Sequence, residues 1–71
     1  MAKQYELFES LGNGRKLVFK TFPTFDQAWQ ELKQMQPVSM ELDEDHAECA
    51  DAYTKDGRIL AIQPVGFKID N

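Results

Sequence analysis

The chain has 71 residues, a formal net charge of −4 and a single cysteine. A chain of this length forms one domain and buries only about 60% of the surface that it exposes when unfolded. One cysteine excludes an internal disulfide, and one cysteine with one histidine excludes a zinc site built only from these two residue types. Residues 1–71 are therefore predicted to form a single small domain that is stabilised by packing or by self-association.

Composition and charge exclude several classes of protein. Hydrophobic residues make up 42% of the chain, including five Phe, two Tyr and one Trp, which is too many for a disordered protein. Residues 38–71 carry eight acidic and three basic side chains, so direct binding of nucleic acid is not expected. No apolar run resembles a signal peptide or approaches the roughly 18 residues of a membrane span. With its lone cysteine, the sequence predicts a cytoplasmic protein that does not bind membranes.

The first predicted unit is a β-hairpin within Tyr5–Phe22, where two apolar segments flank Gly12-Asn13-Gly14. Asn-Gly between apolar segments is a strong hairpin signal, because a type I′ turn needs positive φ at both central residues. The returning strand carries three basic residues, and strict alternation places Lys16 and Lys20 on the same outer face. With Arg15, they are candidates for binding an acidic partner or the acidic loop of a second copy. The alternative is that they protect a sheet edge from aggregation.

The next predicted unit is an amphipathic helix with signals at both ends. Thr24 can cap its N-terminus, with Gln27 completing a capping box, and Pro37 disfavours helical geometry in the residue before it. Apolar residues recur at helical spacing and are expected to pack on the sheet, led by Phe25, Trp29 and Leu32.

Three further strand segments follow the helix. Val38–Asp43 alternates like a half-buried strand, and a second hairpin is predicted around Asp56-Gly57, again with type I′ chemistry. Its returning strand, Ile59–Ile62, is apolar on both faces and therefore predicted to lie at the centre of the sheet. Val65–Ile69 is expected to add a short edge strand or to drape over the core.

Together these elements predict an α+β fold with the order β-β-α-β-β-β. The expected architecture is one twisted antiparallel sheet with a single amphipathic helix packed on one face. The sequence does not predict the order of the strands beyond the two hairpins.

The acidic segment Asp43–Asp51 is the one cluster that resembles a metal site. A calcium-binding EF-hand loop beginning at Asp43 would need Gly at position 6 and Glu at position 12, where the chain has Glu48 and Thr54. A zinc or iron site from neighbouring side chains would lack a second His or Cys. The more direct interpretation is a solvated acidic loop, so no metal or cofactor is expected.

Cys49 and His46 are the remaining candidates for catalysis. A catalytic thiolate needs a positive environment, whereas Cys49 has Asp45, Glu48 and Asp51 as neighbours in sequence. We therefore expect Cys49 to be buried and inert and the protein not to be an enzyme.

The function predicted from these features is a protein–protein interaction module or a homodimer, acting through an exposed sheet face or edge. One alternative is an acidic decoy that presents the carboxylates of Asp43–Asp51 to a basic nucleic-acid-binding protein and so inhibits it, with Asp43, Glu44 and Asp45 as the candidate residues. Another alternative is an accessory subunit of an enzyme. The sequence does not choose among these functions.

Overall fold

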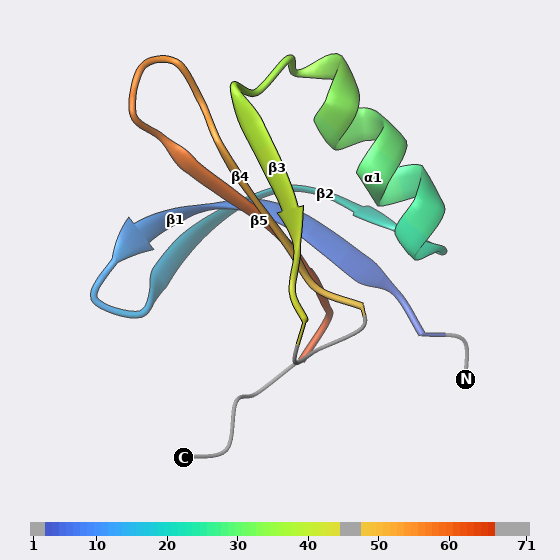
Figure 1. Ribbon diagram of the computed structural model, residues 1–71. Helices are drawn as coiled ribbons and strands as arrows, with labels where there is room; N and C mark the ends of the chain where they lie inside the picture. The colour runs from blue at the N-terminus through green and yellow to red at the C-terminus, as the bar shows by residue number, and fades with distance from the viewer. Residues whose placement is uncertain (1–2, 45–47, 67–71) are drawn as a thin grey trace.

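The computed structural model describes residues 3–44 and 48–66. Its elements are β1 (Tyr5–Gly12), β2 (Arg15–Phe22), α1 (Phe25–Gln34), β3 (Ser39–Leu42), β4 (Ala50–Tyr53) and β5 (Ile59–Pro64). The strands form one antiparallel sheet in the order β2-β1-β5-β4-β3, and α1 lies on one side of it (Figure 1). The predicted α+β class and order of elements are confirmed. No helix in the described ranges has the length and apolarity needed to span a membrane.

The centre of the sheet is β5, as its apolar sequence predicts. It pairs with β1 on one side and with β4 on the other. Leu60 and Ile62 are buried beneath α1, whereas Ala61 is buried on the opposite face. Ile59, on the same face as Ala61, is 42% exposed, so the consecutive apolar residues of β5 are fully buried on the α1 side and only partly buried on the other. Of the predicted Val65–Ile69 segment, only Val65 and Gly66 are among the described residues.

The two hairpins turn in different ways. Asn13 and Gly14 have φ values of 55° and 74°, which confirms the predicted type I′ geometry. The prediction of a type I′ turn at Asp56-Gly57 is wrong, because only Gly57 has a positive φ there. The Gly57 N–H donates to the Thr54 carbonyl at 3.1 Å, and the Thr54 N–H donates to the Arg58 carbonyl at 3.0 Å. A three-residue loop that ends in a left-handed glycine bulge replaces the two-residue turn.

Both ends of helix α1 are set by interactions among residues close together in the chain. Its N-cap is Thr24, as predicted, and the Thr24 hydroxyl accepts a hydrogen bond from the Gln27 N–H at 3.2 Å. The helix ends at Gln34, before Pro37, because Gln36 takes the left-handed conformation with φ 55°. Its N–H then donates to the Lys33 carbonyl at 3.0 Å and satisfies one free carbonyl of the last turn.

The core lies between α1 and the sheet. Ala28 and Leu32 are the buried residues of the helix, whereas Phe25 and Trp29 pack against the margin of the core. The Phe25 ring stacks on the Trp29 ring, with their centres 6.0 Å apart. It makes a T-shaped contact with the Tyr5 ring, with their centres 6.1 Å apart. The sequence therefore predicts correctly which face of the helix is packed. The centre of that face is occupied by Ala28 and Leu32, which are smaller than Phe25 and Trp29.

Candidate functional site

The face of the sheet opposite α1, hereafter the open face, is not covered by α1 (Figure 1). Strand pairing decides which side chains share it, because successive residues of a strand point to opposite faces. The pairs place these residues on the open face: Glu6, Phe8, Ser10, Lys16, Val18, Thr21, Ser39, Glu41, Asp51, Tyr53, Ile59, Ala61 and Gln63.

One row of this face crosses all five strands in the order Glu41, Asp51, Ala61, Phe8 and Val18. The row is acidic over β3 and β4, and apolar over β5, β1 and β2. Phe8 and Ala61 are buried, whereas Val18 is 42% exposed.

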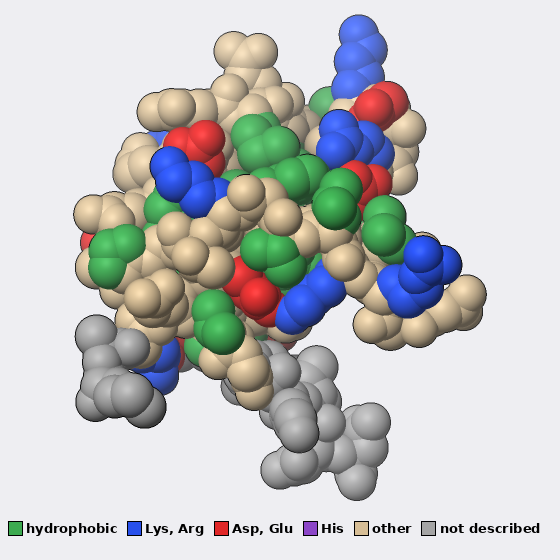
Figure 2. Space-filling model, turned by 180° about the vertical axis from the view of Figure 1, so that it is seen from behind, with side chains coloured by type: hydrophobic (Ala, Val, Ile, Leu, Met, Phe, Trp, Pro, Cys, Tyr) green, Lys and Arg blue, Asp and Glu red, His purple; other side chains and the backbone are tan. Residues whose placement is uncertain are grey.

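The next row adds two more apolar side chains, since Tyr53 of β4 pairs with Ile59 of β5. They are 43% and 42% exposed, respectively. We call the apolar part of both rows the apolar strip; it consists of Phe8, Val18, Tyr53, Ile59 and Ala61. Seen from behind the view of Figure 1, the molecule shows several separate groups of hydrophobic side chains, with acidic and basic side chains beside one another (Figure 2).

A charge pair occupies the β1–β2 part of the open face. Glu6 is only 6% exposed, and its carboxylate accepts a hydrogen bond from the Lys16 ammonium group. The same ammonium lies 5.0 Å from the centre of the Phe8 ring. Lys16 therefore neutralises a buried carboxylate and covers an aromatic ring.

The predicted basic patch is not assembled, because β2 contains a bulge at Phe19. Leu7 pairs with Lys20 but Phe8 pairs with Val18, so Phe19 has no counterpart on β1. The extra residue shifts the alternation, and Lys20 lies on the α1 side, 5.3 Å from the centre of the Phe22 ring. The prediction that Lys16 and Lys20 share a face is wrong.

Arg15 is exposed at the beginning of β2, directly after the turn. Because successive side chains of a strand point to opposite faces, Arg15 does not share the face that carries its neighbour Lys16. A role of Arg15, Lys16 or Lys20 in partner binding stays a prediction.

Carboxylates gather at the opposite end of the open face. Glu41 and Asp51 lie directly opposite one another in the β3–β4 pair. Burial, together with the charges of Asp43 and Glu41, raises the pKa of the Asp51 carboxyl. An open hollow of about 620 Å³ lies beside them, lined by Glu41, Leu42, Asp43, Glu44 and Asp51. The structure thus brings the predicted candidates Asp43 and Glu44 together; Asp45 lies outside the described residues.

Sequence reasoning included Asp51 in the acidic segment but did not bring it together with Glu41, because the two residues belong to separate strands. The signal that could have found them is the alternation of each segment. If 39–42 and 50–53 are paired as antiparallel neighbours, Glu41 and Asp51 fall on the same face.

Cys49 is buried, as expected for an inert thiol. Burial raises its pKa, and the charges of Asp43, Asp51 and Glu48 raise it further. Glu48 itself accepts hydrogen bonds from the Lys3 ammonium, at 2.7 Å, and from the Tyr5 hydroxyl. Those two bonds lower the pKa of Glu48 and keep its carboxylate occupied within the fold.

Within the described ranges, no three His, Cys, Asp or Glu side chains are arranged to hold a metal ion. His46, which the sequence offers as a ligand, lies outside those ranges.

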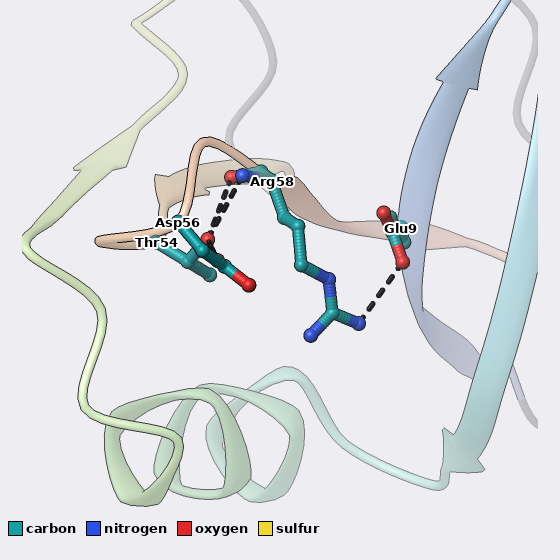
Figure 3. A network of polar contacts seen from close by, with 4 residues as sticks. All are labelled: Glu9, Thr54, Asp56 and Arg58. Carbon is teal, nitrogen blue, oxygen red and sulfur yellow. Dashed lines mark hydrogen bonds and ion pairs between the residues drawn. The ribbon is translucent and has the colours of Figure 1, made fainter.

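A second polar network joins the β4–β5 turn to β1 on the α1 side of the sheet. Arg58 extends from this turn toward Glu9, and its guanidinium donates to the Glu9 carboxylate at 3.0 Å (Figure 3). The same guanidinium lies 5.8 Å from the centre of the Phe19 ring. Within the turn, the Thr54 hydroxyl accepts from the Arg58 N–H at 2.9 Å and donates to Asp56 (Figure 3). Each charge has a structural partner, so the network positions the hairpin.

No protein-family model matches the chain, and no curated protein or solved structure is significantly similar to it. Inference about function therefore depends on the surface of this molecule. Its distinguishing combination is an apolar strip that continues into carboxylates across the paired strands of one sheet face.

Proposed function

We propose that this protein is a non-enzymatic protein-binding module that uses the open face of its sheet. The observation that supports this function is the apolar strip, in which Val18, Tyr53 and Ile59 each expose about two fifths of their surface. A solvated face of an antiparallel sheet ordinarily carries polar side chains. Apolar side chains that a sheet leaves partly exposed are suited to packing against another protein.

The two edges of the sheet are less suited to binding than the face. At one edge, β2 contains the bulge at Phe19 and carries Lys16 and Lys20. At the other edge, β3 has only four residues and carries Glu41. Bulges, charged side chains and short strands oppose the addition of a further strand. Binding by the face is therefore favoured over strand addition.

Site-specific photo-crosslinking in cells tests the proposed surface. A photoreactive phenylalanine analogue replaces Val18 on the open face or, as a matched control, its neighbour Leu17, which is similarly exposed on the α1 side. We expect a defined protein adduct from position 18 and little or none from position 17. Equal adducts at both positions, or none at position 18, would contradict binding by the open face.

A second candidate function is an acidic decoy for a nucleic-acid-binding protein. It is supported by the hollow in which Asp43 and Glu44 join Glu41 and Asp51. The decoy must bind a basic protein. This binding should weaken steeply as salt is added and should be lost in the Asp43→Asn, Glu44→Gln variant. Binding that this variant leaves unchanged would eliminate the decoy.

A further inference from the structure

Building on the proposed binding by the open face, we infer that its partner is a basic amphipathic helix of another protein. The apolar side of this helix would cover the apolar strip, and a lysine or arginine at one end would lie against Glu41 and Asp51. The partner helix would then complete a three-layer arrangement, since α1 already covers the other face of the sheet.

The arrangement of the open face sets the length and polarity of the partner. Neighbouring strands lie about 4.8 Å apart, so the distance from Glu41 on β3 to Val18 on β2 is about 19 Å. A helix rises about 1.5 Å per residue, and about 13 residues cover this distance. The basic residue belongs at the end of the helix that lies over β3 and β4.

The charges of the open face distinguish a basic partner from a second copy of the chain. Lys16 is neutralised by Glu6 within the fold. Within residues 3–44 and 48–66, neither Glu41 nor Asp51 makes an ion pair, so both carboxylates remain available to a partner cation. A dimer that stacks β3 of one copy on β3 of the other would bring like charges together, and one that stacks β3 on β2 would set the carboxylates beside Lys16, whose charge Glu6 already neutralises.

The pairing of Glu41 with Asp51 is locally unfavourable for the sheet. Glu41 and Asp51 are directly opposite one another, and like charges in such a pair destabilise a sheet. Departures from local folding preferences of this kind are concentrated at functional sites. A cation that binds between the two carboxylates would turn the repulsion into two attractive interactions.

Two synthetic 13-residue helical peptides test the inferred chemistry. They share one leucine-rich face and differ only at the terminal residue, which is arginine in one peptide and glutamate in the other. Binding is measured by fluorescence anisotropy, and the contact surface by the amide chemical shifts of Val18, Tyr53 and Ile59. We expect the arginine peptide to bind about tenfold more tightly and to shift these amides.

Two double variants with the same change of charge identify the carboxylates that are involved. Glu41→Gln with Asp51→Asn is expected to remove most of the preference for arginine. The control, Asp26→Asn with Glu31→Gln, changes two acidic residues of α1 and should retain it. Equal affinity of both peptides, or an equal loss in both double variants, would overturn the inferred cation site.

The outcomes separate this inference from the proposed function. If the peptides fail to shift the open-face amides while the photo-crosslink at position 18 still forms, the partner chemistry is wrong and the binding surface stands. An adduct with a mass of two 8.2 kDa chains would identify a second copy and overturn the basic helix. If neither experiment detects binding at the open face, both proposals fail.

Discussion

The two faces of the central strand β5 both carry aliphatic residues but have different environments. Leu60 and Ile59 are neighbours in β5, yet Leu60 is fully buried under α1 and Ile59 is 42% exposed on the open face. Hydrophobicity does not distinguish these two side chains, whereas the presence of a second layer does. The difference shows that α1, and not the strand sequence alone, decides which face of β5 becomes the core.

The two faces also achieve burial by different means. On the α1 side, the small side chains Ala28, Ala50 and Ala52 are buried together with larger aliphatic ones, so the helix packs closely. On the open face, Glu6 is only 6% exposed, and its carboxylate forms an ion pair with Lys16. The first face is held by apolar packing and the second by a charge pair.

The largest expected effect on stability comes from substitutions in β5, which test the difference in packing between its two faces. Leu60→Ala should lower the free energy of unfolding by about 2–5 kcal/mol, because it leaves a cavity beneath α1. Ile59→Ala, in the same strand, should cost less than about 1 kcal/mol, because its side chain is already partly in water. Urea unfolding followed by the fluorescence of Trp29 measures both. Similar losses would show that the faces do not differ in packing.

The charge pair on the open face is expected to have the next largest effect. Lys16→Met leaves the buried Glu6 carboxylate without its partner and should cost about 2–3 kcal/mol. Lys20→Met is the control, because Lys20 only covers the Phe22 ring, and should cost less than about 1 kcal/mol.

Adding Glu6→Gln to Lys16→Met should recover part of the lost stability, because an amide tolerates burial better than an unpaired carboxylate. Chemical denaturation checks this recovery. A double variant no more stable than Lys16→Met would mean that the charge of Glu6 is not the cause.

A substitution just after the end of α1 should raise the stability of the fold without altering the open face. Gln36 has φ 55°, a conformation that costs a non-glycine residue about 1 kcal/mol. Gln36→Gly is expected to raise the stability by about 0.5–1 kcal/mol. Gln30→Gly, at an exposed position in the middle of the helix, should lower it by a similar amount. Thermal unfolding of both variants compares the signs, and a loss in both would contradict this account of the helix end.

The smallest expected effect comes from the carboxylates of the open face. Because the pKa of Asp51 is raised in the folded state, stability should fall as the pH rises from the ordinary pKa of Asp through this raised pKa. Asp51→Asn should remove this penalty and stabilise the protein at pH 7 by a few tenths of a kcal/mol, since solvent screens the repulsion.

Measurement of the unfolding midpoint across pH tests this sign. The gain from Asp51→Asn should vanish below about pH 3, where the side chain is protonated in both states. Asp26→Asn is the control of opposite sign, because it removes a negative charge from the first turn of α1. A loss of stability on substituting Asp51 at neutral pH would contradict the proposed repulsion.

Local chemistry in the sequence determined the elements and several of their boundaries. Asn13-Gly14 specified the first turn because few residues tolerate positive φ, and Thr24 specified the start of α1 because its hydroxyl can accept from the Gln27 N–H. The central position of β5 followed from its apolar residues at consecutive positions. Each of these features depends on residues close together in the chain.

Only the tertiary structure decided the strand order, the bulge at Phe19 and the meeting of Glu41 with Asp51. The bulge depends on how β2 fits against β1, and it moved Lys20 to the other face from Lys16. Glu41 and Asp51 became neighbours through the β3–β4 pairing. These features arise from contacts between segments, because one residue of register exchanges the two faces and the alternation within a segment does not say which segment it pairs with.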